Sequence, residues 1–377
     1  MEDAFLVDGV RSAFGRRGGA LSGLRPDDLG AQVLNQLMDR VGLDPAAVED
    51  VRLGCATQIG EQGLNLGRLL PLIAGWPVTV PGATVNRMCG SSLEALNECA
   101  QAIMAGTHDV MVACGVESMS RVPMLSDATQ GFPPGLTSRF EIVPQGMSAE
   151  LIAERWHLSR EELDRFSLES HRRAIAAQDS GILAEEIVPV SIDGSSVATD
   201  EGPRRDTSLE KLAGLKTVFK ADGVVTAGNS SQITDGAAAV VMASGSAVRR
   251  YDLKPLARVV AMALVGVDPV IMLTGPIPAT EKVLQKAGLR FDQIDVVEIN
   301  EAFASVVLAW GREYEPDWSR VNPHGGAISL GHPLGASGAR LALAAARDLR
   351  RRQGRYALVT MCIGWGIGIA TILENAS

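Results

Sequence analysis

A cysteine at position 89 stands in the sequence Asn-Arg-Met-Cys-Gly-Ser-Ser-Leu (86–93), directly before a segment with the apolar spacing of an amphipathic helix. The unpaired backbone N–H groups and the dipole at the start of such a helix favour a thiolate, which is the nucleophilic form of cysteine. A small buried apolar side chain is the commoner fate of a free cysteine. From this context alone, a nucleophile and a buried structural residue are equal alternatives for Cys89.

A histidine at position 332 lies between a glycine and a proline, in a loop ahead of another predicted helix. A fixed imidazole there can take a proton from a thiol at neutral pH. The alternative is a histidine that only caps the following helix. His324 competes for the role of base, although its neighbours favour a turn. The other three histidines lie in polar or charged contexts, and we expect them to face solvent: His108, His157 and His171.

Two further side chains stand where buried strands are expected to end. Cys362 ends an apolar run at a glycine-rich turn, and Asn300 follows the apolar run 296–299. Strand ends are where α/β folds present ligand-binding residues, and the backbone N–H of Gly364 can approach a substrate oxygen. The alternatives are a buried strand cysteine for Cys362 and a helix N-cap for Asn300. The remaining cysteines are interpreted as buried strand residues: Cys55, Cys99 and Cys114.

The elements that would position these side chains occur twice along the chain. Residues 43–56 align with residues 289–302, and each segment follows a glycine that closes an amphipathic helix. In each half a loop then opens a helix that ends at a glycine before a buried strand, at 109–115 and at 356–363. Uninterrupted apolar strands between helices predict mainly parallel sheets covered by helices. The fold class is therefore α/β, built from two similar halves.

The composition changes between about residue 118 and residue 220. This stretch holds a Pro-Pro pair, a charged helical run and a polar loop, and Ser159 with Glu162 has the form of a capping box. An apolar segment interrupted by glycines follows at residues 223–244. This pattern predicts a buried strand that rejoins the first sheet. We therefore predict an N-terminal half of residues 1–117 with 221–250, an inserted loop domain of residues 118–220, and a C-terminal half of residues 251–377.

The 377 residues, 46% of them hydrophobic and 21% charged, are typical of a globular protein and exclude a small secreted scaffold. A net charge of −9 lacks the basic footprint of a protein that binds nucleic acid or anionic membranes. Five cysteines without zinc or disulfide spacing, and no visible targeting signal at either end, lead us to expect a cytoplasmic protein without a metal site. The uncharged run 356–373 approaches the length of a membrane span, but its glycines favour two strands around a bend.

Taken together, these segments resemble the thiolase family over essentially the whole chain. The motifs are Asn-Arg-Met-Cys at 86–89, Ala-Gly-Asn-Ser-Ser at 227–231, Asn-Glu-Ala-Phe at 300–303, Gly-His-Pro at 331–333 and Cys-Ile-Gly at 362–364. The chain is similar to the Cys-Cys-His thiolases, which break or make a carbon–carbon bond β to a CoA thioester. The resemblance implies a five-layered αβαβα core of two similar halves, a loop domain over CoA, and a homodimer or homotetramer. It implies acyl-CoA and CoA as substrates and no metal or redox cofactor.

The resemblance also implies a role for each candidate residue. Cys89 would attack the keto carbon of a 3-ketoacyl-CoA after His332 has deprotonated it, and Cys362 would protonate the departing acetyl-CoA enolate. CoA would then take the acyl group from Cys89. His332 and a water held by Asn300 would bind the enolate oxygen, while the N–H groups of Cys89 and Gly364 would bind the tetrahedral oxyanion. Five positions would contact CoA, the arginine near the nucleotide end: Arg204, Phe219, Ala227, Ser231 and Phe303.

Two positions depart from the family pattern. Trp365 replaces the usual second glycine after Cys-x-Gly, and Pro144 and Gln145 stand near where the short-chain type carries His-Met against the acetyl group. The acyl chain length is therefore open, and a degradative 3-ketoacyl-CoA thiolase or a broad acetyl-CoA acyltransferase is favoured. A short-chain acetyl-CoA C-acetyltransferase, which is an acetoacetyl-CoA thiolase, is the alternative.

Two other classes of function are weighed against a thiolase. A ketoacyl-synthase-like condensing enzyme shares the duplicated fold and the nucleophilic cysteine, but Cys362 and the Asn-Glu-Ala-Phe motif speak against it. An inactive CoA-binding or lipid-binding relative would be indicated by the reshaping of the site around Trp365. The presence of two thiols and a histidine favours an enzyme over that alternative.

Overall fold

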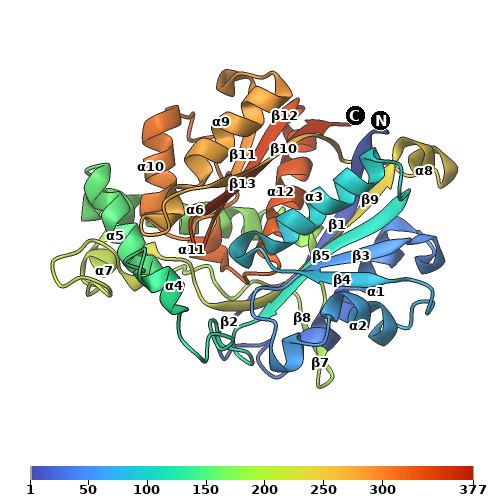
Figure 1. Cartoon of the computed structure of the whole chain (residues 1–377), viewed down its shortest axis with the longest axis horizontal. Helices are drawn as coiled ribbons and strands as arrows, with labels where there is room; N and C mark the ends of the chain where they lie inside the picture. The colour runs from blue at the N-terminus through green and yellow to red at the C-terminus, as the bar shows by residue number, and fades with distance from the viewer. Residues whose placement is uncertain (1, 377) are drawn as a thin grey trace.

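The computed structural model describes residues 2–376, and its main sheet runs in the order β11-β12-β13-β10-β1-β9-β5-β3-β4 (Figure 1). The N-terminal half of the sheet comprises β1 (Ala4–Ser12), β9 (Thr234–Ser244), β5 (Val110–Ser118), β3 (Asp50–Gly54) and β4 (Gly82–Val85). The C-terminal half comprises β10 (Ala257–Gly266), β13 (Ile367–Asn375), β12 (Tyr356–Ile363) and β11 (Val296–Ile299). The halves meet where β1 pairs with β10 at Phe5 and Leu6. The second half repeats the strand arrangement of the first, as the internal repeat predicts.

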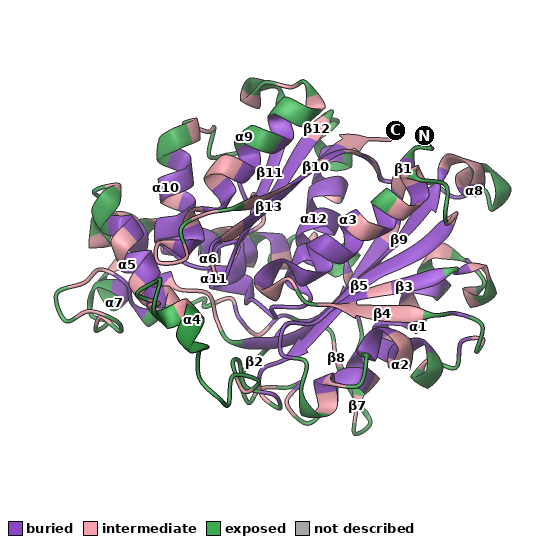
Figure 2. Cartoon of the chain, in the orientation of Figure 1, coloured by how far each residue is buried: buried purple, intermediate pink, exposed green. Residues whose placement is uncertain are grey.

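Helices form three layers around the two halves of the sheet. The middle layer is α3 (Ser91–Met104) and α12 (Ser337–Arg352), whose apolar side chains share one core cluster with strands of both halves. The outer face of the N-terminal half is covered by α1 (Pro26–Val41) and α2 (Leu66–Ile73). The outer face of the C-terminal half is covered by α9 (Pro276–Ala287) and α10 (Ala304–Tyr314). The result is the expected αβαβα order, with the middle helices and central strands coloured as buried in Figure 2.

The prediction of mainly parallel strands is wrong, because the sheet is mixed. For example, β5 pairs in parallel with β3 but antiparallel with β9, and β12 pairs in parallel with β11 but antiparallel with β13. Within β5, Val110 and Val112 face the outer cluster while Met111 and Ala113 face the middle helices. Both faces of the central strands are therefore buried, so an antiparallel strand carries the same uninterrupted apolar sequence as a parallel one.

The segment between β5 and β9 contains α4 (Pro134–Thr137), α5 (Gln145–Arg155), α6 (Arg160–Asp179) and α7 (Leu209–Ala213). The capping box is confirmed at the start of α6, where Ser159 N donates to the Glu162 carboxylate at 2.8 Å. Contacts join α5 to α10, and α6 to both α10 and α11 (Ala327–Leu330). The return to the first sheet is also confirmed, since β9 lies between β1 and β5. The domain boundaries themselves stay a prediction.

Short elements complete the fold. A hairpin of β7 (Val190–Ile192) and β8 (Ser195–Val197) stands apart, while β2 (Gly15–Arg16) pairs with β9 and β6 (Ile187–Val188) pairs with β1. The helix α8 (Gly245–Arg250) follows β9. The uncharged run 356–373 forms β12 and most of β13, as predicted, and no helix within residues 2–376 is long and apolar enough to cross a membrane. Met1 and Ser377, which belong to the ends read for targeting signals, lie outside the described residues.

Candidate active site

Cys89 lies in a 3₁₀ turn, Met88–Gly90, that leads directly into α3. The turn is tight: Met88 has a φ of 48°, and its N–H donates to Asn86 Oδ1 at 2.9 Å. A Cβ on Gly90 would lie 2.5 Å from Ile363 Cδ1, so the turn packs closely on the end of β12 and a larger residue would displace that side chain. These local features place the Cys89 side chain, which is 5% exposed, between the two halves of the protein.

Burial raises the pKa of the Cys89 thiol to about 11, while the backbone N–H groups of Gly364 and of Cys89 itself lower it. The thiol is therefore protonated at neutral pH, and the start of α3 does not by itself produce the thiolate that the sequence suggested. The N–H of Gly364 nevertheless lies where it stabilises negative charge near the sulfur. A nucleophile at this position needs a base.

His332 is 4% exposed, and burial lowers its pKa to about 4, so the imidazole is neutral at pH 7. Its Nδ1 lies 2.6 Å from Ser337 Oγ, and that hydroxyl donates to the Pro333 carbonyl at 2.9 Å. The hydroxyl must therefore accept from Nδ1–H, because it has one proton to give. This leaves Nε2 unprotonated, and Nε2 accepts from Asn300 Nδ2 at 3.2 Å. The hydrogen bonds thus select the tautomer in which Nε2 is the basic nitrogen.

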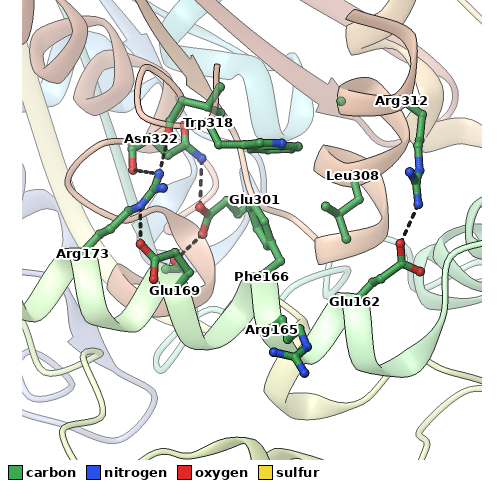
Figure 3. Close-up of a pocket in the computed structure, with 13 residues that line it drawn as sticks. Glu162, Arg165, Phe166, Glu169, Arg173, Glu301, Leu308, Arg312, Trp318 and Asn322 are labelled. Carbon is green, nitrogen blue, oxygen red and sulfur yellow. Dashed lines mark hydrogen bonds and ion pairs between the residues drawn. The ribbon is translucent and has the colours of Figure 1, made fainter. Parts of the chain in front are cut away.

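Asn300 directly follows β11, and its neighbour Glu301 fixes the loop that carries it. The buried carboxylate of Glu301 accepts hydrogen bonds from Ser170 Oγ at 2.7 Å, Asn322 Nδ2 at 2.9 Å and Ile328 N at 3.2 Å. Figure 3 shows the bond between Asn322 and Glu301. Glu301 therefore ties α6 and α11 to the end of β11. It was not among the residues singled out in the sequence, although it lies inside the Asn-Glu-Ala-Phe motif.

Cys362 lies near the end of β12, fully buried, one residue before the strand's last position. Burial raises the pKa of this thiol well above its usual range, and the negative charge that Cys89 carries when ionised raises it further. Cys362 is therefore a protonated thiol that senses the charge of Cys89. A weak acid beside a nucleophile is suited to giving a proton to a carbanion that forms there.

Glu117 is a second buried carboxylate that the sequence did not single out. It accepts hydrogen bonds from the backbone N–H groups of Ala56 at 2.8 Å, Thr57 at 3.0 Å and Gly335 at 2.8 Å, and from Gln62 Nε2 at 2.8 Å. Gly335 belongs to the loop after the candidate base, while Ala56 and Thr57 belong to the opposite half. A lone glutamate in the apolar strand 110–118 was the signal that could have identified it. Glu117 therefore fixes the loop at 56–57 of one half and the loop at Gly335 of the other relative to each other.

A cavity of about 500 Å³ opens over Cys89. Four of the predicted site residues line it, and they are Cys89, Gly364, Phe219 and Phe303. His332, Asn300 and Cys362 do not line it, but Leu334, two residues beyond the histidine, packs against Cys89. The rest of the lining is mostly apolar and comes from the loops at 56–57, 124–132 and 142–146 and from the turn at 364–365. The structure therefore brings Cys89 and Gly364 to one apolar cavity, and Cys362 lies outside its lining but close enough for the charge of Cys89 to affect it.

A second depression, of about 220 Å³, holds Arg204 and Ala227. His171 lies beneath it, 3% exposed, and its Nδ1 accepts from Arg204 N at 3.1 Å. The prediction that His171 faces solvent is wrong, because the charged sequence of α6 does not reveal which face the loop covers. Ser231 lines neither cavity, and its N–H donates to Ala302 O at 2.9 Å. His108 is half-buried and His157 is exposed.

The remaining predicted residues also have definite places. Cys55 directly follows β3 and Cys114 lies within β5, both buried, whereas Cys99 is buried in α3 and not in a strand. His324 Nε2–H donates to the Asp348 carboxylate at 2.8 Å, and His324 does not line the cavity over Cys89. Within residues 2–376, no group of three or more His, Cys, Asp or Glu side chains is arranged to hold a metal ion.

A third depression, of about 420 Å³, lies between α6 and α10 (Figure 3). Its charged side chains largely pair within the lining, Arg312 with Glu162 at 2.5 Å and Arg173 with Glu169 at 3.0 Å. Phe166 is also part of this lining. Paired charges of this kind are typical of a solvated helix face. We therefore place the reactive centre at the Cys89 cavity.

The protonation states predict how Cys89 reacts with iodoacetamide in the absence of substrate. Because a thiol of pKa about 11 is almost wholly protonated below pH 9, the alkylation rate constant is expected to rise about tenfold per pH unit between pH 6 and pH 9. Mass spectrometry of the peptide that carries Cys89 measures this rate, with a Cys89→Ala protein as the control for other sites. A plateau below pH 8 would contradict it and would indicate a preformed thiolate–imidazolium pair.

Comparisons with known proteins agree with this arrangement. The family model "Thiolase, N-terminal domain" matches residues 4–246, and "Thiolase, C-terminal domain" matches residues 253–375. The chain is 50% identical to the steroid 3-ketoacyl-CoA thiolase FadA6 of Mycobacterium tuberculosis, over 100% of this chain and 95% of the relative. It is 49% identical to the 3-oxoadipyl-CoA/3-oxo-5,6-dehydrosuberyl-CoA thiolase of Escherichia coli, over 100% of both chains. The crystal structure of the Bacillus anthracis acetyl-CoA acetyltransferase superposes with a TM-score of 0.93 at 37% identity, covering 100% of this chain and 99% of that one. The protein therefore belongs to the thiolase family of acyltransferases.

Proposed function

We propose that this protein cleaves a 3-ketoacyl-CoA with CoA to give acetyl-CoA and a shortened acyl-CoA, through an acyl group held on Cys89. The observations that carry the proposal are a protonated Cys89 thiol beside the Gly364 N–H and a neutral His332 whose Nε2 is free of protons, two residues before the Leu334 that packs against Cys89. The relatives support it, because both are named as thiolases of 3-ketoacyl-CoA or 3-oxoacyl-CoA substrates. The same steps in reverse would condense two acyl thioesters.

In the first half-reaction, Nε2 of His332 takes the proton of the Cys89 thiol as the sulfur attacks the keto carbon. The developing oxyanion meets the N–H groups of Cys89 and Gly364, and one such donor is typically worth about 3 kcal/mol. The bond between the second and third carbons then breaks, and its electron pair leaves on acetyl-CoA as an enolate. His332 and a water held by Asn300 bind the enolate oxygen, and Cys362 supplies the proton that completes acetyl-CoA.

In the second half-reaction, the Cys362 thiolate takes the proton of an incoming CoA thiol. The CoA sulfur attacks the acyl carbon on Cys89, and the Cys89 sulfur leaves and recovers its proton from His332. Each proton that leaves a side chain in the first half-reaction is thus returned in the second. These steps require CoA alone besides the side chains, so we propose no metal or redox cofactor.

For CoA itself, we propose a path from the depression at Arg204 and Ala227 to the cavity over Cys89. Arg204 offers a cation to the nucleotide phosphates in a protein of net charge −9, while Lys211 in the same depression is paired with Asp206 at 2.8 Å. Phe219 and Phe303 pack edge to face with centroids 6.3 Å apart at the cavity over Cys89, where the pantetheine arm would enter. Ser231 would contact the arm between these two sites.

We also propose a homodimer or homotetramer. The strand β4 ends the main sheet, and it pairs only with β3 among the described strands. Large apolar side chains are exposed close to it in sequence, with Leu64 at 89% and Val78 at 76%. An open edge beside exposed apolar residues fits a second copy of this chain. Light scattering is expected to give two or four times the chain mass of 39.8 kDa, and the mass of one chain would exclude this assembly.

The direct test is to incubate the protein with a short and a long 3-ketoacyl-CoA and free CoA, and to follow acetyl-CoA release. We expect release together with a mass increase on the Cys89 peptide equal to the shortened acyl group. Turnover confined to acetoacetyl-CoA would favour the short-chain acetyltransferase. CoA binding with neither release nor adduct would favour an inactive CoA-binding relative, and a strong preference for acyl-carrier-protein substrates would favour a condensing enzyme.

A further inference from the structure

We propose, on the basis of the thiolase function above, that the cavity over Cys89 accepts a bulky, uncharged apolar acyl group and rejects one that ends in a carboxylate. We further propose that Trp365 is the residue that determines this specificity. Three observations carry the proposal: the backbone conformation of Trp365, the aromatic pair that it forms, and the charge of the cavity lining. Each bears on the acyl group and none on the chemical steps at Cys89.

Trp365 occupies the turn between β12 and β13 in a left-handed conformation, with a φ of 69°. Glycines flank it on both sides, and Gly366 has a φ of 79°. A bulky side chain in this region of backbone space is an outlier, because its Cβ crowds the backbone where glycine would not. Such an outlier in a cavity wall indicates that the side chain serves the site rather than the turn.

The indole of Trp365 forms one wall of the cavity together with a residue of the segment between β5 and β9. Its ring and that of Phe132 pack edge to face with centroids 5.1 Å apart. Leu125 and Val143 extend the same apolar lining. A flat aromatic wall gives the largest apolar contact to a ring or a branched chain, while a single methyl group covers little of it. The volume of about 500 Å³ lies in the range of cavities that enclose whole small molecules.

The charge of the lining decides against acyl groups with a terminal carboxylate. Among the described residues that line the cavity there is no Lys, Arg or His, and the one charged side chain is the carboxylate of Asp127. A carboxylate at the end of the acyl chain would exchange water for apolar side chains without gaining a cation, and it would also approach the exposed carboxylate of Asp127. Both effects oppose binding, because a charge is desolvated at low cost only when it is paired.

The test compares kcat/KM for three substrates that differ only in the acyl end: 3-ketohexanoyl-CoA, 3-ketoadipyl-CoA and 3-cyclohexyl-3-ketopropanoyl-CoA. The first two have the same number of acyl carbons and differ by a methyl group against a carboxylate. We expect kcat/KM for 3-ketohexanoyl-CoA to exceed that for 3-ketoadipyl-CoA by at least about 30-fold, and the ring substrate to be cleaved at least as well as 3-ketohexanoyl-CoA.

Two variants test whether Trp365 determines the preference for a ring and whether Asp127 determines the discrimination against a carboxylate. Trp365→Gly is expected to lower the ratio of ring to straight-chain kcat/KM about tenfold, while Asp127→Asn is expected to lower the ratio of kcat/KM for 3-ketohexanoyl-CoA to that for 3-ketoadipyl-CoA several-fold. Trp318→Ala, which removes an indole that does not line this cavity, is the control and should alter no ratio. Circular dichroism and the urea midpoint verify that each variant is folded.

The outcomes separate the two proposals. If wild-type protein cleaves 3-ketohexanoyl-CoA but cleaves 3-ketoadipyl-CoA equally well or better, the specificity proposal is overturned and the thiolase function stands. An unchanged ring preference in a folded Trp365→Gly protein overturns the role of Trp365. If none of the three substrates releases acetyl-CoA, the proposed function itself fails.

Discussion

Replacing Cys89 with serine is expected to lower kcat for cleavage of a 3-ketoacyl-CoA by at least about 10⁴-fold and to abolish the covalent acyl adduct. The thiol already has a pKa of about 11 in its buried turn, and the alcohol of serine is a far weaker acid. A neutral imidazole whose pKa is about 4 therefore has too little basicity to activate it. The size and the hydrogen-bonding groups of the side chain change little, so the loss reports on nucleophilicity.

Single-turnover cleavage and mass spectrometry of the intact protein measure this effect. Cys114→Ala is the matched control, because it removes a thiol that is also buried but lies in β5 outside the cavity lining. The control should keep activity within a few-fold of wild type. A Cys89→Ser protein that still cleaves substrate within tenfold of wild type would show that another group accepts the acyl chain.

The second large effect is expected from Cys362→Ser, which should divide the reaction into its parts. Acylation of Cys89 by acetyl-CoA should fall far less than cleavage, because it forms no carbanion and the departing CoA thiolate, a much weaker base, depends less on a proton from Cys362. Carbon–carbon cleavage should fall by about 10²–10⁴-fold, the range typical for loss of a positioned proton donor. The fully buried Cys362 has a raised thiol pKa, and the serine hydroxyl is a still weaker acid.

Three readouts test the division of roles: the amount of acetyl-enzyme formed from acetyl-CoA, the rate of thiolysis, and the exchange of the methyl protons of acetyl-CoA with deuterium in solvent. Proton exchange should be lost together with cleavage, while acetyl-enzyme formation should persist. Equal losses in acylation and cleavage would refute the separate roles of the two thiols.

The sequence by itself determined those features that are encoded in contiguous stretches of residues. The internal repeat and the buried strand runs predicted two similar α/β halves, and the turn between 356–363 and the following strand was found where the glycines indicate it. The motifs around Cys89, Asn300, His332 and Cys362 carried the resemblance to the thiolase family, and each of these residues stands at a strand end or before a helix. These are local relations, and local sequence specifies them.

Only the tertiary structure decided strand direction, protonation state and the roles of buried polar groups. Antiparallel and parallel central strands carry the same apolar sequence when helices cover both faces, so β9 and β13 could not be oriented in advance. The basic nitrogen of His332 depends on Ser337 and Asn300 together. Burial, not the start of α3, sets the pKa of Cys89.

The same holds for the residues that the sequence did not single out. Glu117 accepts a hydrogen bond from Gly335, 218 positions further along the chain, and no window of sequence contains both. Trp365 was visible as a departure from the family, but its contact with Phe132 joins a turn of the second half to a loop of the segment between β5 and β9. Hydrogen bonds and burial depend on distances in space, and these distances are determined only when the two halves and the intervening segment pack together.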